Sequence, residues 1–544
     1  MSQAMVCAPQ PEAVEAGLDV LARGGNVIDA AIGAALVQTV VDPQMCGVAG
    51  FGSMQIYRAD TDSHHSIDFH GRAPLSTRAD QWEHLIVRES DDGFGFILRG
   101  EVNEIGYQSM TTPLTLKAFG EALEQFGTKP LADLIAPAIE YCEQGFTVRP
   151  AVQRFWHQPS IAGRIKRMRV ITDNAASAKI YLKPDGSLHE VGEVLRNPDM
   201  GNTYRRIAEH GIEDFYCGEI ARAIDTDMRA HGGHITLEDL RTCSTEHTVP
   251  LEGTYRGFQV HTNQPPGGGL MILEMLNILE QFDLGSMGHN SADYIATVSE
   301  AMKIATVDKD ARTGDPRFVD IPVAELTSKA YAAAQADLIR SGKLTHVPRV
   351  NTGGPESKDT THICVADTAG NVVSMTHSLG SSSGVVTEGL GFMYNNCMMV
   401  FDPRPGYTGS LAPGKARFSA LCPTTLFKDG KPYLTLGAPG GTTITMGVLQ
   451  TILNVVDFDM SAQEAVSAPR FCTTSDTVEL TNRILRSVER ELVRRGYPTR
   501  RYPVSYMVPL VHAIRLRNGA LDGGADPAGD GMAATVQVAP TDGH

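Results

Sequence analysis

Residues 26–41 constrain the fold of this chain more than any other stretch, because they are apolar at almost every position. Asp29 and Gln38 interrupt the run from Val27 to Val41. A helix that is apolar on nearly all sides must be buried on most of them, as in a helical layer packed on a sheet. The run is also shorter than the ~20 residues that a membrane-spanning helix needs. We therefore expect a buried helix in a globular protein and no membrane segment.

The chain before residue 345 alternates between helical and strand-like stretches. Residues 11–22 predict a helix, with Pro11 in its first turn and Gly24-Gly25 as its stop. Glycines then lead into a strand at 53–57, whereas a dinucleotide-binding fingerprint needs a strand before the glycines and is therefore excluded. Farther along we expect a capping box from Thr236 to Asp239, a strand at 255–262, a turn at 264–269 and a helix at 270–281.

After residue 345 the pattern changes. Residues 345–359 are polar, contain proline and glycine and lack periodicity, which predicts an exposed, mobile segment. Two β-hairpins and a helix follow, with strands at 363–366, 372–376, 424–427 and 433–436 and the helix at 443–456. Helices and strands in both parts of the chain predict an α+β fold of stacked helical and sheet layers.

The overall composition narrows the functional classes. The chain has 544 residues, enough for one very large domain or roughly two to four ordinary ones. Its formal net charge of −16 argues against nucleic acid as a partner, because binding nucleic acid needs a basic surface. The first residues lack the basic region and continuous apolar core of a secretory signal, so we expect a cytoplasmic location.

The nine cysteines are scattered, odd in number and without a CxxC pair. This spacing supports neither a disulfide framework nor a zinc site. We expect buried, reduced thiols, and neither a metal nor another cofactor.

The first predicted hairpin places two hydroxyl groups face to face. If residues 367–371 form the loop, Ala366 pairs with Val372, and counting outward sets Thr360 across from Ser378. Facing residues of an antiparallel pair have Cβ atoms about 4.5–5.5 Å apart. Thr–Ser pairs are ordinary in sheets, so this geometry alone does not establish a function.

The position of Thr360 after the polar segment gives this pair a chemical interpretation. A threonine hydroxyl is a weak nucleophile and needs an adjacent base. Cleavage of the Asp359–Thr360 bond would give Thr360 a free α-amine, whose ordinary pKa of about 7.7–8.0 suits a base at neutral pH. Nucleophile and base would then belong to one residue.

A glycine pair could supply the other half of such a site. Gly440 and Gly441 lie between a predicted strand and a predicted helix. Backbone N–H groups at the start of a helix can stabilise the oxyanion of acyl transfer, and glycine lets the substrate approach closely. The alternative is a tight turn without chemistry, since glycine pairs are common in turns.

Several segments together resemble the gamma-glutamyltransferase family. The segment DTTHICVADTAGNVVSMTHSLGSSSGVVTEGLGFMYNN (359–396) is similar to the start of that family's small subunit, with its Thr-Thr-His triplet and its Asp-x-x-Gly-Asn hairpin. Further resemblance lies in APQPEAVEAGLDVLARGGNVIDAAIGAALVQTVVDP (8–43), FHGRAP (69–74), GGHITLEDL (232–240), YRGFQVHTNQPPGGG (255–269), RFSALCPT (417–424) and APGG (438–441). The resemblance therefore covers essentially the whole chain.

This resemblance implies a fold and a set of roles. The fold is the four-layer αββα sandwich of N-terminal-nucleophile hydrolases, an α+β fold. It is formed by a large segment, 1–359, and a small segment, 360–544, which stay associated after self-cleavage between Asp359 and Thr360. The implied roles are Thr360 as the nucleophile, Ser378 as the hydroxyl that orients it, Gly440 and Gly441 as the oxyanion hole, and Ser419 as a contact to a substrate carboxylate.

The substrate-binding positions depart from the family's pattern. His70 stands where the family has an arginine that pairs with the substrate carboxylate, and Val400 stands where an aspartate binds the substrate α-amine. Cys397 replaces a glutamine, and Ala420 replaces the second of two serines. A buried ammonium without an anion would cost about several kcal/mol, so a glutamyl group should bind badly. Candidates for a replaced carboxylate contact are Arg72, Arg404 and Arg417, unless they are solvated surface residues.

Three functions stay open. The chain is an enzyme acting on a small-molecule amide with a non-glutamyl acyl group, of the cephalosporin acylase kind; or an ordinary γ-glutamyl hydrolase acting on glutathione; or an uncleaved, non-enzymatic relative. The complete set of Thr360, Ser378, Gly440 and Gly441 argues against the third. Besides the substrate, the expected partners are the chain's own two fragments, and assembly into a homo-oligomer stays open.

Overall fold

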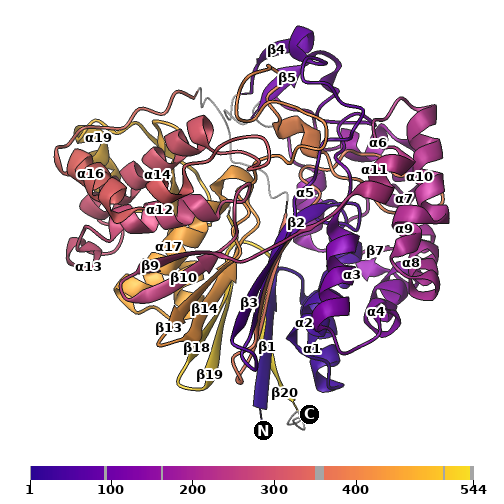
Figure 1. Cartoon of the computed structure of the whole chain (residues 1–544), viewed down its shortest axis with the longest axis horizontal. Coiled ribbons are helices and arrows are strands. Elements are labelled where there is room, and N and C mark those ends of the chain that lie inside the picture. The colour runs from indigo at the N-terminus through magenta and orange to yellow at the C-terminus, as the bar shows by residue number, and fades with distance from the viewer. Residues whose placement is uncertain (1, 91–94, 161–162, 350–359, 507–508, 539–544) are drawn as a thin grey trace.

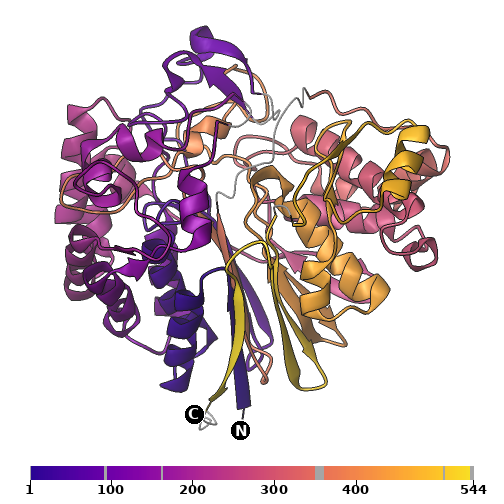
Figure 2. The same ribbon diagram turned by 180° about the vertical axis from the view of Figure 1, so that it is seen from behind.

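Two β-sheets packed face to face form the centre of the molecule, and each is covered by helices on its outer side (Figure 1). The computed structural model describes residues 2–90, 95–160, 163–349, 360–506 and 509–538. Seen from behind, the same four layers follow one another, helices, sheet, sheet and helices (Figure 2). The predicted four-layer αββα architecture is therefore confirmed.

The first sheet has seven antiparallel strands and contains the predicted nucleophile hairpin. Its order is β20 (Met532–Val538), β1 (Ser2–Ala8), β11 (Thr361–Asp367), β12 (Val372–Ser378), β2 (Phe51–Arg58), β3 (Ser63–Phe69) and β8 (Glu246–Thr248). Strand β11 pairs with β1 on one side and with β12 on the other. Strands from before and after residue 360 are therefore interleaved within one sheet.

The second sheet has six strands, in the order β19 (Ala520–Ala525), β18 (His512–Arg517), β14 (Lys431–Gly437), β13 (Thr424–Lys428), β10 (Phe258–Thr262) and β9 (Leu251–Tyr255). The single strand expected at 255–262 is wrong, because Arg256 and Gly257 both have positive φ and turn the chain back between β9 and β10. The β13–β14 loop is also shorter than expected. Asp429 and Gly430 alone form its turn, and two successive positive φ angles suit a tight hairpin.

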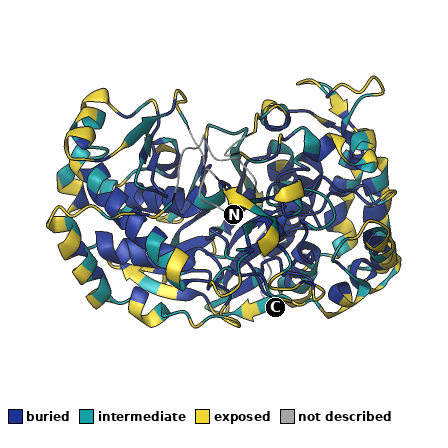
Figure 3. Ribbon diagram, turned by 90° about the horizontal axis from the view of Figure 1, so that it is seen from above, coloured by how far each residue is buried: buried dark blue, intermediate teal, exposed yellow. Residues whose placement is uncertain are grey.

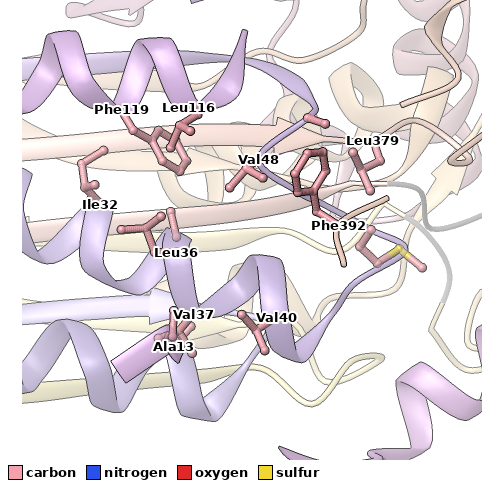
Figure 4. Close-up of a cluster of buried hydrophobic side chains, with 14 of the residues drawn as sticks. Ala13, Ile32, Leu36, Val37, Val40, Val48, Leu116, Phe119, Leu379 and Phe392 are labelled. Atoms are coloured by element: carbon pink, nitrogen blue, oxygen red, sulfur yellow. The ribbon is translucent and has the colours of Figure 1, made fainter. Parts of the chain in front are cut away.

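Helix α2 (Val27–Val41) confirms the expectation drawn from its apolar sequence, since all fifteen of its residues are buried. Asn26 caps it, accepting from the N–H of Asp29 while the Asp29 side chain accepts from the N–H of Asn26. The helix packs on β11 and β12 within the layer formed by α1 (Pro11–Ala22), α2, α3 (Thr115–Phe126), α4 (Leu131–Gln144) and α8 (Pro198–His210). Figure 4 shows Ile32 and Leu36 of α2 facing Phe119 of α3 in this core.

The second sheet is covered by α12 (Gly269–Leu279), α14 (Ala292–Arg312), α16 (Lys329–Arg340) and α17 (Ile444–Phe458). The other described elements are α5 (Pro150–Trp156), α6 (Arg169–Thr172), α7 (Ala175–Tyr181), α9 (Glu213–Cys217), α10 (Glu219–Ala230), α11 (Leu237–Thr242), α13 (Leu284–Met287), α15 (Val323–Leu326), α18 (Ala462–Ser467), α19 (Arg486–Arg494), β4 (Ile86–Glu89), β5 (Phe96–Leu98), β6 (Phe146–Thr147), β7 (Val194–Leu195), β15 (Phe471–Cys472), β16 (Val478–Leu480) and β17 (Thr499–Arg501). Buried residues fill the middle of the molecule and exposed ones line its outer helices (Figure 3).

The segment expected to be exposed is partly anchored. Within 345–349, Val347 is buried and its N–H donates to Asp476, while Arg349 forms an ion pair with Asp310. His346 and Pro348 are exposed and Thr345 and Arg349 are half-buried, so the expectation of exposure fails at Val347. Residues 350–359, including Asp359, lie outside the described residues.

Seven of the nine cysteines are buried, whereas Cys217 is exposed and Cys243 is half-buried, so the expectation of buried thiols fails at these two positions. Within the described part of the chain, no helix has the length and apolarity needed to cross a bilayer. No group of three or more potential metal ligands occurs among those residues either.

A buried polar network joins helix α2 to the hairpin. The Gln38 side chain donates to Gln10 (2.7 Å) and to the Thr361 hydroxyl (3.1 Å), and it accepts from His377 Nε2 (2.9 Å). Gln10 in turn donates to Asp42 (2.7 Å). Buried polar groups need such partners, so this network fixes the position of β11 against the helical layer.

We predict that Gln38→Leu lowers the free energy of unfolding by about 2–4 kcal/mol, because it leaves buried polar atoms of His377 and Gln10 without their partner. Chemical denaturation measures the effect. Gln144→Leu, on the exposed end of α4, is the matched control and should change stability little. Equal stability of the two variants would contradict the role given to the network.

Candidate active site

The hairpin places Thr360 opposite Ser378 with the predicted register. Thr361 pairs with His377 and Ala366 with Val372, as the five-residue loop requires. One residue farther, the Thr360 and Ser378 hydroxyl oxygens are 3.0 Å apart, and both residues are buried. The Ser378 hydroxyl also accepts from the N–H of Gly380 (2.9 Å). Ser378 is thereby fixed as a hydrogen-bond partner for the Thr360 side chain.

Side chains alternate between the faces of β11, which separates Thr360 from its neighbour. The Thr361 hydroxyl points to the network of Gln10 and Gln38 on the helical side. His362 points to the opposite side, where it bonds the Thr376 hydroxyl (2.8 Å) and lies against Gly437 of the second sheet. Thr360 therefore shares the side of β11 that faces the second sheet.

Strand β14 brings the glycine pair to this end of the hairpin. A Cβ added at Gly437 would lie 2.3 Å from the His362 ring, so only glycine permits this approach of the two sheets. After β14, Gly440 (φ 148°) and Gly441 (φ 57°) lead through a 3-10 turn into α17. Among the described residues, no hydrogen bond uses the N–H of Gly440 or Gly441. Such N–H groups are suited to an oxyanion.

Two adjacent asparagines hold the loops that surround the hairpin end. Asn396 accepts from the N–H of Ser381 (2.8 Å) and donates to the Glu104 carbonyl (2.9 Å). Asn395 accepts from the N–H of Thr111 (3.0 Å). The sequence showed this pair only as part of a motif, because its partners lie far away along the chain.

Ser419 lies in a loop that is hydrogen-bonded to the turn before α12. Its N–H donates to the Pro266 carbonyl (2.9 Å), and its hydroxyl oxygen accepts from the N–H of Leu421 (3.2 Å). The hydroxyl hydrogen is thus available to a substrate. The carbonyl of Ala420 packs against Gly268, where an added Cβ would lie 2.6 Å away.

His70 and Arg72 differ in their hydrogen-bond partners. His70 is buried, its Nδ1 bonds Asp68 (2.5 Å), and its Nε2 has no hydrogen-bond partner in the described structure. Arg72 donates to Glu246 (2.7 Å), so a carboxylate already neutralises its charge. Its Nε and Nη1 have no hydrogen-bond partner in the described structure, so a contact from Arg72 to a substrate carboxylate stays a prediction.

Arg404 is also paired with a carboxylate, that of Asp402. Its guanidinium forms two hydrogen bonds to Asp402, at 2.9 and 2.7 Å, and these raise its pKa. It lies over the rings of Phe96 and Tyr407, with 4.5 and 4.3 Å between its central carbon and the ring centroids. Asp402 therefore already neutralises Arg404, and a contact from Arg404 to a substrate carboxylate stays a prediction.

A cleft of about 250 Å³ contains Arg404, Val400 and Phe418 in its lining. Val400 is half-buried there, at the end of the 3-10 turn Cys397–Val400. Cys397 lies behind it, fully enclosed, and a Cβ added at Gly380 would be 3.9 Å from its sulfur. The structure therefore divides the predicted substrate-binding residues between this cleft and the buried region beside Gly380.

Arg417 and Phe51 meet in that buried region. The central carbon of the guanidinium is 4.5 Å from the Phe51 ring centroid, and Phe51 pairs with Ser378 across β2 and β12. Phe51 was missed at the sequence level, because nothing in a lone aromatic residue before a strand indicates a contact 366 positions away.

The αββα sandwich is the fold of the N-terminal-nucleophile hydrolases. Within it lie a buried threonine, a hydroxyl that contacts it and a glycine turn that enters a helix. Comparison with known proteins identifies the branch. Residues 13–536 match the gamma-glutamyltranspeptidase family, and the chain belongs to it.

Relatives of two kinds are similar to the chain. The acylase ACY 1 proenzyme of Pseudomonas sp. (strain V22) is 38% identical, covering 92% of this chain and 88% of the relative. The glutathione hydrolase proenzyme of Escherichia coli (strain K12) is 34% identical, over 86% and 80%. The solved cephalosporin acylase from Bacillus halodurans superposes with a TM-score of 0.86 at 30% identity, covering 98% of this chain and 96% of that structure.

We predict that Gly441→Val lowers kcat/KM by about 10²–10³-fold, because a side chain there obstructs the approach of substrate to the oxyanion donors. Gly430→Val is the matched control. Gly430 also has a positive φ of 73°, with open space around its Cβ, so the variant carries similar backbone strain away from the site. Thermal melting of both variants separates strain from catalysis, and unchanged turnover in a folded Gly441→Val protein would place the oxyanion donors elsewhere.

Proposed function

We propose that this chain hydrolyses an amide through an acyl-enzyme on Thr360, after cutting itself between Asp359 and Thr360. The observation that carries the proposal is the 3.0 Å contact between the Thr360 and Ser378 hydroxyls at the start of β11. A nucleophile there needs no further side chain as base, because cleavage would supply its own α-amine. The proenzyme relatives support the same chemistry.

In the proposed reaction, the Thr360 α-amine takes the proton of the Thr360 hydroxyl as its oxygen attacks the substrate carbonyl. The Ser378 hydroxyl orients the attacking oxygen. The N–H groups of Gly440 and Gly441 stabilise the oxyanion. The protonated amine then gives its proton to the leaving nitrogen, which leaves an ester on Thr360. Water cleaves that ester and restores the threonine.

We further propose that the acyl group lacks an α-ammonium. Val400, Cys397 and Ala420 offer no anion to such a group, and an ammonium held there without a counter-ion would be strongly disfavoured. The similarity to acylases supports this specificity. The similarity to glutathione hydrolases keeps γ-glutamyl hydrolysis as the second candidate.

We predict that purified protein consists of two associated chains of 359 and 185 residues, detected by mass spectrometry. Thr360→Ala should abolish both cleavage and turnover, because it removes the nucleophile. Thr361→Ala is the control and should still cleave, since its hydroxyl serves the network with Gln10 and Gln38. A wild-type chain that stays intact after long incubation at neutral pH would contradict the proposal. So would cleavage that is lost in Thr361→Ala and kept in Thr360→Ala.

We predict that kcat/KM is higher for the glutaryl amide of cysteinylglycine than for glutathione, which differs from it by the α-amine. Polar substrate groups left unpaired in a site cost binding and rate. If glutathione is instead preferred by about tenfold or more, a difference worth about 1.4 kcal/mol, the chain is an ordinary γ-glutamyl hydrolase.

A further inference from the structure

Arg417 is a buried cation without a carboxylate. Its exposed fraction is 9%, its Nε has no hydrogen-bond partner, and no ion pair to it exists among the described residues. Other buried cations have polar partners: Arg470 pairs with Asp526, Lys303 pairs with Glu300, and Lys415 donates to the carbonyls of Thr408 and Ser410. An unpaired buried charge is costly to folding, so its presence needs a reason.

The groups around Arg417 do not cancel its charge. Burial raises the pKa of the Cys397 thiol to about 11, so at neutral pH this neighbour carries no negative charge. Burial also lowers the pKa of the Arg417 guanidinium, but arginine starts so high that it remains protonated. The Phe51 ring offers a cation–π contact, which is weaker than an ion pair, and the guanidinium Nε has no hydrogen-bond partner in the described structure.

Two routes of contact connect Arg417 to the proposed nucleophile. Through Phe51 it reaches Ser378, the cross-strand partner of Phe51 on the same face of the sheet. Through Cys397 it reaches Gly380, whose N–H bonds the Ser378 hydroxyl. Both routes end at the hydroxyl that contacts Thr360.

The position of Arg417 also compensates for a loss. The family pattern has an arginine at position 70, where this chain has His70. The His70 ring lies 6.4 Å from the Phe51 ring, and the Arg417 guanidinium lies 4.5 Å from that ring. The pocket has therefore kept a cation near Phe51 but receives it from the loop that carries Ser419. Because the cation near Phe51 is now the Arg417 guanidinium, we expect a substrate carboxylate to bind at Arg417.

We propose that Arg417, together with the Ser419 hydroxyl, binds a carboxylate at the far end of the acyl group. The substrate would then be the monoamide of a short dicarboxylic acid. This inference rests on the proposed amidohydrolase function and adds the residue that selects the substrate. A guanidinium suits the task because its planar fork can donate two parallel hydrogen bonds to one carboxylate. Arg72 and Arg404 each already pair with an acid.

The test compares three p-nitroanilides that differ only in the acyl group: glutaryl, pentanoyl, which lacks the carboxylate, and γ-glutamyl. Wild type should prefer glutaryl. Arg417→Met should lower kcat/KM for glutaryl by at least about 30-fold, as expected when one partner of a buried charge pair is removed. It should leave pentanoyl within about threefold of wild type, because that substrate never used the guanidinium. Self-cleavage should be unaffected.

Arg340→Met is the matched control, since Arg340 also stacks on a phenylalanine, Phe282, but on the exposed surface of α16. It should change none of the three rates. Arg417→Lys, which keeps the charge without the fork, should fall between wild type and Arg417→Met for glutaryl alone.

The outcomes separate the two levels of inference. Equal losses for glutaryl and pentanoyl in Arg417→Met, or no loss for glutaryl, would overturn the assignment of Arg417 while wild-type hydrolysis still supports the amidohydrolase. A wild type that prefers the γ-glutamyl anilide would overturn the proposed specificity without reference to any variant. If Arg417→Met does not fold, inhibition of wild type decides: free glutarate should compete at concentrations at least about tenfold below those of pentanoate.

Discussion

The antiparallel pairing of β11 with β12 is the constraint on which the rest of this protein depends. It sets Thr360 against Ser378 and sends Thr361 to the opposite face of the sheet. A shift of one residue would exchange the two threonines, because side chains alternate along a strand. The register is held from the helical side by Gln38 and from the second sheet by the contact of His362 with Gly437. The position of one hydroxyl therefore depends on three of the four layers.

The same topology explains why a cut before β11 would leave the molecule in one piece. In the first sheet, β11 pairs with β1, which precedes residue 360. In the second sheet, β13 follows residue 360 and pairs with β10, which precedes it. Each sheet therefore takes strands from both sides of residue 360. Separating the fragments would break main-chain hydrogen bonds in both sheets and expose the hydrophobic core between the sheets to water. Both changes are unfavourable, so the fragments would stay associated without the peptide bond that joined them.

Charge around the hairpin end follows a simple pattern. Arg72 and Arg404 are each neutralised by an acid, and the carboxyl of Asp68 bonds His70. Arg417 differs from them, because the residues around it are aromatic or uncharged at neutral pH. Polar groups of a binding pocket are commonly fewer than its apolar ones, and each then carries much of the specificity. One uncompensated cation beside a nucleophile is such a group.

The sequence by itself determined the buried helix α2, the Thr360–Ser378 register and the glycine turn, because each follows from a local rule. The four-layer order was implied by the family resemblance. Apolar periodicity, loop length and turn residues act over a few neighbouring positions. The sequence misjudged 255–262, where two successive residues with positive φ reverse the chain. It also left three arginines as equal candidates. Only the tertiary structure separated them, because a charge is neutralised by whatever lies near it in space: Glu246 reaches Arg72 from 174 positions away, and Phe51 meets Arg417 from 366.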